Sequence, residues 1–140
     1  MRIRTIGALL ASLTLATVVV GSASAVGGRP FVIELTGANE VPGPGDPDGT
    51  GTAWLSVNPG TGSVCWQIEW ANVGEPFAGH IHHAPAGVAG PVVVPFNPPS
   101  GGCTTADRDL LVDIMRNPAD YYVNIHNAEF PGGIIRGQLR

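Results

Sequence analysis

Three of the four histidines of this chain lie within one short segment, residues 78–94, and the fourth lies near the C-terminal end. His80 and His82 are separated by one residue and His83 follows directly, whereas His126 is distant in the sequence. An H-x-H pair completed by one distant histidine is a common ligand set for Zn²⁺ or Cu²⁺, because imidazole nitrogen suits both metals. The spacing therefore makes His80, His82 and His126 candidate ligands for copper or zinc, in a site that could be redox-active.

The side-chain alternation of a β-strand would bring these histidines to one face of a sheet. Residues two apart on a strand point to the same face, so His80 and His82 share a face that excludes Ile81. In the run 121–127 the same rule places Asn124 and His126 together. We expect the core to take Ile81, Val123, Ile125, Ile135 and Leu139, and the opposite face to take His80, His82, Asn124, His126, Arg136 and Gln138.

A structural polar network is the first interpretation of that face, and a metal site is the alternative. Polar residues are expected on the solvent side of a half-buried sheet. Histidines there would bond to Asn124, Glu129 or backbone carbonyls, and Arg136 would pair with Glu34, Glu40 or Glu129. Ring nitrogens that converge to roughly 3–4 Å with an open coordination position would favour a metal, whereas saturated rings would favour the network.

The sequence around the histidines predicts an all-β domain. Short runs of alternating or apolar residues are separated by turns rich in glycine and proline, which number 20 and 13 in the chain. One segment, 105–116, instead has apolar residues at helical spacing, with Thr104 or Thr105 as a possible N-cap and Asn117-Pro118 as its end. We expect one short helix packed on a β-sandwich whose strands are 31–36, 50–57, 63–70, 78–83, 92–96, 121–127 and 133–139.

The first 25 residues have the features of a cleaved secretory signal peptide. Two arginines precede an apolar run, and an A-x-A site follows at 23–25. We expect a single exported domain over residues 26–140 with no further segment able to span a bilayer. Five arginines against eleven acids give this domain a formal charge of −6 and no lysine, which argues against nucleic acid as a partner.

Two cysteines, Cys65 and Cys103, are the only ones in the chain. In an exported protein an even pair indicates a disulfide bond. A pair of thiolate metal ligands is the alternative, although neither cysteine has a CxxC or Cys-His neighbour.

The chain resembles the CHRD domain, a module found in chordin and in many exported bacterial proteins. The resemblance covers nearly the whole of residues 26–140 and implies a secreted, immunoglobulin-like or Greek-key β-sandwich, without implying a reaction. It is carried, in this order, by LTGANEVP at 35–42, GTG at 49–51, HIH at 80–82, AGVAGPVVV at 86–94, YVNIH at 122–126, PGG at 131–133 and RGQL at 136–139.

Catalysis has little support in the sequence, so we expect a binding protein. No G-x-S-x-G elbow is present, the acids are scattered, and the cysteines are expected to be oxidised. The first hypothesis is an extracellular interaction module whose partner is an unidentified protein or glycan; the second is a copper or zinc domain. Aromatic residues could line a glycan or peptide surface, although they more often fill a sandwich core: Trp54, Trp66, Trp70, Tyr121 and Tyr122.

Overall fold

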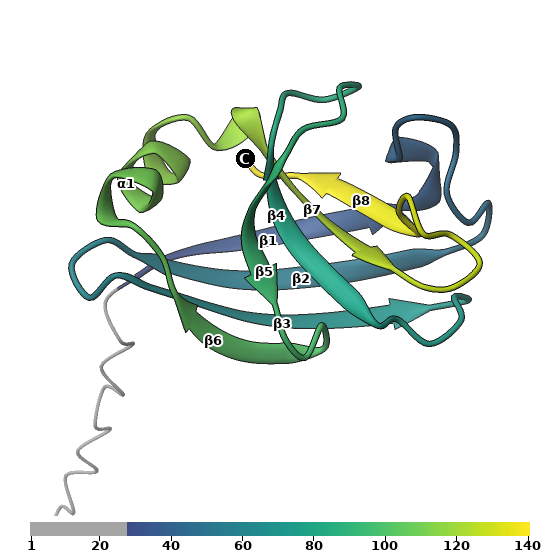
Figure 1. The fold of residues 1–140 in the computed structure, drawn as a ribbon, viewed down its shortest axis with the longest axis horizontal. Helices are drawn as coiled ribbons and strands as arrows, with labels where there is room; N and C mark the ends of the chain where they lie inside the picture. Colours follow the sequence, from purple (N-terminus) through teal and green to yellow (C-terminus); the bar gives the residue numbers. More distant parts are fainter. Residues whose placement is uncertain (1–27) are drawn as a thin grey trace, which may run out of the picture.

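The computed structural model describes residues 28–140, and the predicted signal peptide lies outside them. The described part of the chain folds into eight antiparallel strands, one α-helix and two 3₁₀ helices (Figure 1). The strands are β1 (Arg29–Thr36), β2 (Thr50–Asn58), β3 (Ser63–Ala71), β4 (Ala78–His83), β5 (Val92–Phe96), β6 (Gly101–Thr105), β7 (Tyr121–His126) and β8 (Ile135–Gln138). The helices are η1 (Gly37–Asn39), α1 (Arg108–Arg116) and η2 (Pro118–Asp120).

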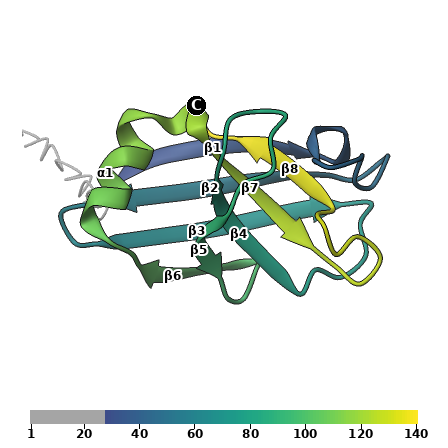
Figure 2. The same ribbon diagram turned by 45° about the horizontal axis from the view of Figure 1, so that its top comes forward.

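All eight strands belong to one bent sheet in the order β5-β4-β7-β8-β1-β2-β3-β6. In Figures 1 and 2, β1, β2 and β3 run side by side while β4, β5 and β7 cross in front of them. The bend lies between β8 and β1, which share the single residue pair Thr36 and Arg136. The edge strands β5 and β6 approach each other at the far side, so the sheet is a nearly closed barrel.

The predicted all-β fold with one short helix is confirmed, but the sheet arrangement differs from the expected immunoglobulin-like sandwich. A sandwich has two separate hydrogen-bonded sheets, whereas here the Thr36–Arg136 pair joins the two halves into one sheet. Which strands pair at a bend depends on long-range register, and the alternation within single strands carries no information about it.

The alternation of side chains along the strands predicted the core residues correctly. Ile81, Val123, Ile125, Ile135 and Leu139 are completely buried, as expected from the strand pattern. They pack against the inward residues of the other half of the sheet, including Ile33, Leu35, Leu55, Val57, Val64 and Ile68. Among residues 28–140 we find no helix that is long and apolar enough to cross a membrane.

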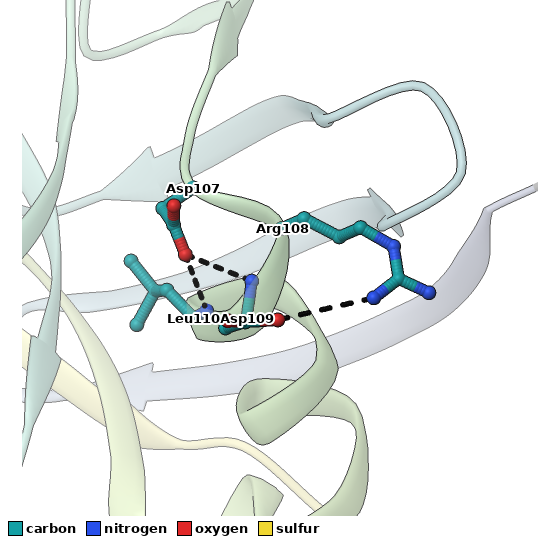
Figure 3. A network of polar contacts seen from close by, with 4 residues as sticks. All are labelled: Asp107, Arg108, Asp109 and Leu110. Atoms are coloured by element: carbon teal, nitrogen blue, oxygen red, sulfur yellow. Dashed lines mark hydrogen bonds and ion pairs between the residues drawn. The ribbon is translucent and has the colours of Figure 1, made fainter.

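The helix α1 begins two or three residues later than the threonines suggested. Thr104 and Thr105 belong to β6, and Asp107 is the N-cap (Figure 3). Its carboxylate accepts hydrogen bonds from the backbone N–H of Asp109 at 2.8 Å and of Leu110 at 3.3 Å. The Arg108–Asp109 ion pair in the same view is exposed and 3.8 Å long, so it contributes little. Buried Leu111 and Ile114 fix the helix on the sheet.

Removing the cap should destabilise the protein. We expect Asp107→Ala to lower the free energy of unfolding by about 1 kcal/mol, because two N–H groups of the first turn lose their acceptor. Asp109→Ala, which removes an exposed acid of the same turn, is the matched control and should cost roughly 0.3 kcal/mol. Urea unfolding measures both; equal losses would contradict the assignment of Asp107 as the cap.

The expected disulfide is confirmed. Cys65 on β3 and Cys103 on β6 lie directly opposite each other and are bonded, with Cα atoms 4.0 Å apart. The bond holds the edge strand β6 to the sheet immediately before the chain enters α1. Its contribution to stability comes chiefly from closing a loop across a sequence separation of 38 residues.

The double variant Cys65→Ser/Cys103→Ser should therefore unfold with a free energy about 4 kcal/mol lower than that of the oxidised protein. Dithiothreitol should lower the stability of the wild type by a similar amount and leave the variant unchanged. A variant as stable as the wild type in urea would show that the bond does not constrain the unfolded chain.

Candidate metal centre

The three candidate histidines converge on the outer face of β4 and β7. These strands are antiparallel neighbours in which His80 lies opposite Asn124 and His126 lies opposite Ala78. His80 and His82 therefore share the outward face of β4, and His126 is the diagonal neighbour of His80. The ring centroid of His80 lies 4.9 Å from that of His126 and 5.3 Å from that of His82. One nitrogen from each ring lies within 4.8 Å of the other two.

This outer face is covered by protein rather than by solvent. The connection between β4 and β5, residues 84–91, folds back across it, and every residue of β7 is buried. Arg136 donates to the carbonyl oxygens of Val88 at 2.9 Å and Pro85 at 3.1 Å, and Gln138 donates to Ala84 at 2.8 Å. His82 is buried beside this connection, and His126 is buried beside the connection between β7 and β8, whereas His80 stays half-buried.

Backbone carbonyls fix the tautomers of the two buried rings. Nδ1 of His82 lies 2.8 Å from the oxygen of Gly90, and Nδ1 of His126 lies 3.1 Å from the oxygen of Pro131. A carbonyl oxygen only accepts, so each Nδ1 carries the proton and each Nε2 keeps a lone pair. Nε2 of His82 is buried and has no hydrogen-bond partner.

The lone pair of His126 faces two further groups of the cluster. Its Nε2 lies 3.1 Å from Nδ1 of His80 and 3.0 Å from the side-chain oxygen of Asn124. A proton on His80 Nδ1 can bridge the first contact, but the Asn124 oxygen is an acceptor that faces another acceptor. Rotation of the amide or a cation bound between these atoms would remove the conflict.

Burial keeps the histidines neutral. Desolvation, followed by the charges of His126 and His82, lowers the pKa of His80 from 6.5 to about 4. Desolvation also lowers the pKa of His82 and of His126, partly offset by the bonds to the Gly90 and Pro131 carbonyls. A neutral imidazole is the form that binds a metal, so protons compete weakly for this site near neutral pH.

Four other polar residues were predicted to belong to this network. Asn124, Arg136 and Glu40 are buried near the histidines, and Glu129 is not. Asn124 and Arg136 are almost fully buried, and Glu40 is 7% exposed. Burial raises the pKa of Glu40 to about 7, and Arg136 and the Asn124 side chain partly offset this rise. Arg136 makes no ion pair within the described residues; its guanidinium instead bonds to carbonyls of the 84–91 connection and stacks on Tyr122 at 3.3 Å. Glu129 is exposed in the β7–β8 connection, apart from this network.

Two groups that matter for the cluster were not found by sequence reasoning. The carbonyls of Gly90 and Pro131 orient His82 and His126, but a backbone carbonyl leaves no signature in residue type. Strand alternation also places Tyr122 on the face of Asn124 and His126, and Tyr122 stacks there on His82 with centroids 4.7 Å apart. His83 is exposed and stacks on Tyr121 instead, outside the cluster.

Comparison with known proteins identifies a family. The model of the CHRD domain matches residues 31–139, which is nearly all of the described chain. This match confirms the resemblance drawn from the motifs between LTGANEVP and RGQL. No curated protein and no solved structure matches the chain.

The neutral histidines predict a loss of stability in acid. Between pH 6.5 and about 4 the unfolded chain binds a proton at His80 that the folded chain does not bind, so the free energy of unfolding falls as the pH falls through this range. We expect the wild type to lose more stability than His80→Gln when urea unfolding is repeated from neutral pH to about pH 4.5. Identical pH dependence of the two proteins would contradict a lowered pKa at His80.

Proposed function

The chain belongs to the CHRD domain family, and we propose that this member is an exported module that binds copper or zinc through His80, His82 and His126. The observation that carries the proposal is the buried, unpartnered Nε2 of His82 beside the lone pair of His126. A buried acceptor without a partner costs about 1–3 kcal/mol, and a bound metal would remove that cost.

The distances require only a modest adjustment to hold a metal. Metal–nitrogen bonds of about 2.0–2.1 Å in a tetrahedral site place ligand nitrogens roughly 3.3 Å apart. His80 and His126 already meet this distance at 3.1 Å, whereas the full set spans up to 4.8 Å. His80 is the least buried of the three rings and can rotate, while His82 and His126 are held in place by their carbonyl bonds.

The histidines make the kind of hydrogen bonds that are common around metal sites in proteins. Metal-bound histidines usually donate their second ring nitrogen to a carbonyl or carboxylate, which fixes the tautomer and orients the ring. His82 and His126 each do so here. The Asn124 oxygen or a water beside half-buried His80 would supply the fourth ligand. Cu²⁺ should bind more tightly than Zn²⁺, and copper, unlike zinc, could exchange an electron with an external donor or acceptor.

A second role as an interaction module is supported by a separate surface. Val32 and Trp54 are direct neighbours across β1 and β2, and they are 64% and 39% exposed on the outward face. Larger contiguous apolar patches mark contact sites for proteins, and this pair could form part of one. The disulfide is consistent with the exported location that both roles require.

Metal titration tests the proposal directly. The protein, produced by export and without a histidine tag, should bind one equivalent of Cu²⁺ or Zn²⁺ in calorimetry. The variant His80→Ala/His82→Ala should bind at least about a hundredfold more weakly, because two ligands are lost. Metal at a hundred times its dissociation constant should raise the free energy of unfolding of the wild type by about 2.7 kcal/mol.

His83→Ala is the matched control, because His83 lies on the same strand but outside the cluster. It should bind metal as the wild type does. If the double variant retains wild-type affinity, or His83→Ala loses as much as the double variant, the cluster is not the metal site and the interaction module becomes the better account.

A further inference from the structure

A second buried acceptor without a partner belongs to Glu40, which lies near Asn124. Glu40 is 7% exposed, and its Oε1 atom has no hydrogen-bond partner. The remaining contacts of the carboxyl group come from the Asn124 side chain and the Val41 backbone. Burial raises the pKa of Glu40 from 4.5 to about 7, so its charged form is costly in the free protein.

No positive group of the described chain neutralises this carboxylate at close range. Arg136 attracts it electrostatically but lies outside ion-pair distance, since Arg108–Asp109 is the one ion pair among residues 28–140. The Arg136 guanidinium is already bonded to the Val88 and Pro85 carbonyls and to Gln138. A buried carboxylate is stabilised by a desolvated positive partner, and a cation from outside would be such a partner.

Glu40 is one of the residues that line a cleft. The cleft lies between the segments 40–44 and 129–133 and has a volume of about 190 Å³. The Glu40 carboxyl group rests against Gly133, where an added Cβ would come within 2.3 Å of it, and Gly133 has a φ of +143°. Only glycine fits there, so the carboxyl group meets the wall of the cleft without a side chain between them. Exposed Glu129 adds a second negative charge to the cleft.

The walls favour an organic cation over a bare metal ion. Calcium needs six to eight oxygen ligands, whereas this cleft is lined largely by proline, glycine and Phe130. Its volume is also several times the ~30 Å³ of a single water. A guanidinium group is planar, bonds a carboxylate through two parallel N–H groups and stacks on aromatic faces. Phe130 and the proline rings offer such faces.

We propose that the cleft between residues 40–44 and 129–133 is a recognition pocket for an arginine side chain of a protein partner, with Glu40 and Glu129 as its anionic contacts. The formal charge of −6 on residues 26–140 would favour the approach of a basic segment. The pocket contains none of the three histidines, so it goes beyond the proposed metal function and does not depend on it.

Two matched ligands test the pocket: N-acetyl-L-argininamide and its neutral isostere N-acetyl-L-citrullinamide, each titrated into the ¹⁵N-labelled protein and followed by NMR. The arginine compound should bind saturably and shift the amide signals of 129–133, whereas the citrulline compound should not. Glu40→Gln should weaken binding at least about tenfold, because the buried charge is lost. Glu75→Gln, an exposed acid outside the cleft, should leave binding unchanged.

Gly132→Leu provides a variant that does not touch Glu40. A Cβ at Gly132 has no neighbour within 4 Å, so the protein should fold while the new side chain blocks the cleft. It should abolish arginine binding and leave metal affinity unchanged, which separates failure of this proposal from failure of the metal site. Equal binding of the citrulline compound, undiminished binding by Gly132→Leu, or no saturable binding to the wild type would each overturn the proposal.

Discussion

The position of Arg136 is the constraint on which most of the other features depend. Its backbone pairs with Thr36 at the bend that joins the two halves of the sheet. Its guanidinium binds the carbonyls of Val88 and Pro85 and stacks on Tyr122, which holds residues 84–91 against the outer face of β7. One residue therefore joins the sheet and creates a buried polar layer on the side of the sheet opposite to the apolar core.

That polar layer determines the chemistry of the histidines. On an open sheet His82 and His126 would face water and titrate near their ordinary pKa values. Both rings are instead desolvated, their pKa values fall, and their Nδ1 protons go to Gly90 and Pro131. Gly90 belongs to the 84–91 connection and Pro131 to the connection between β7 and β8, so two different loops supply the carbonyls that orient the rings.

The sequence predicted the faces of the strands but not what covers them. Alternation was sufficient to place His80, His82 and His126 together and Ile81 and Ile125 in the core, because a strand has only two faces. It could not reveal that residues 84–91 fold back over the outer face, since the path of a loop depends on partners such as Arg136 that are distant in sequence. For the same reason Glu40 and Glu129 looked equivalent, although one is buried and the other is exposed.

Local chemistry was similarly ambiguous where several nearby residues could fill one role. Thr104, Thr105 and Asp107 are all acceptable helix caps, but both threonines pair with β3 and the helix starts only at Arg108, so Asp107 is the cap. The bend between β8 and β1 could not be predicted from the sequence either, because one bridging residue pair adds no periodic pattern to it. In each case the missing information lay in contacts between strands that are distant in the sequence.

The two buried acceptors that lack partners within residues 28–140 are Nε2 of His82 and Oε1 of Glu40, and Asn124 lies near both residues. Each costs about 1–3 kcal/mol, a large fraction of the stability of a domain of this size. Native proteins satisfy nearly all buried polar groups, so exceptions cluster where a ligand completes the hydrogen bonding. One acceptor is a neutral nitrogen beside two other imidazoles, and the other is a carboxylate beside a cleft. The first suits a transition metal and the second a guanidinium, so their different chemistry argues for two separate ligands rather than one.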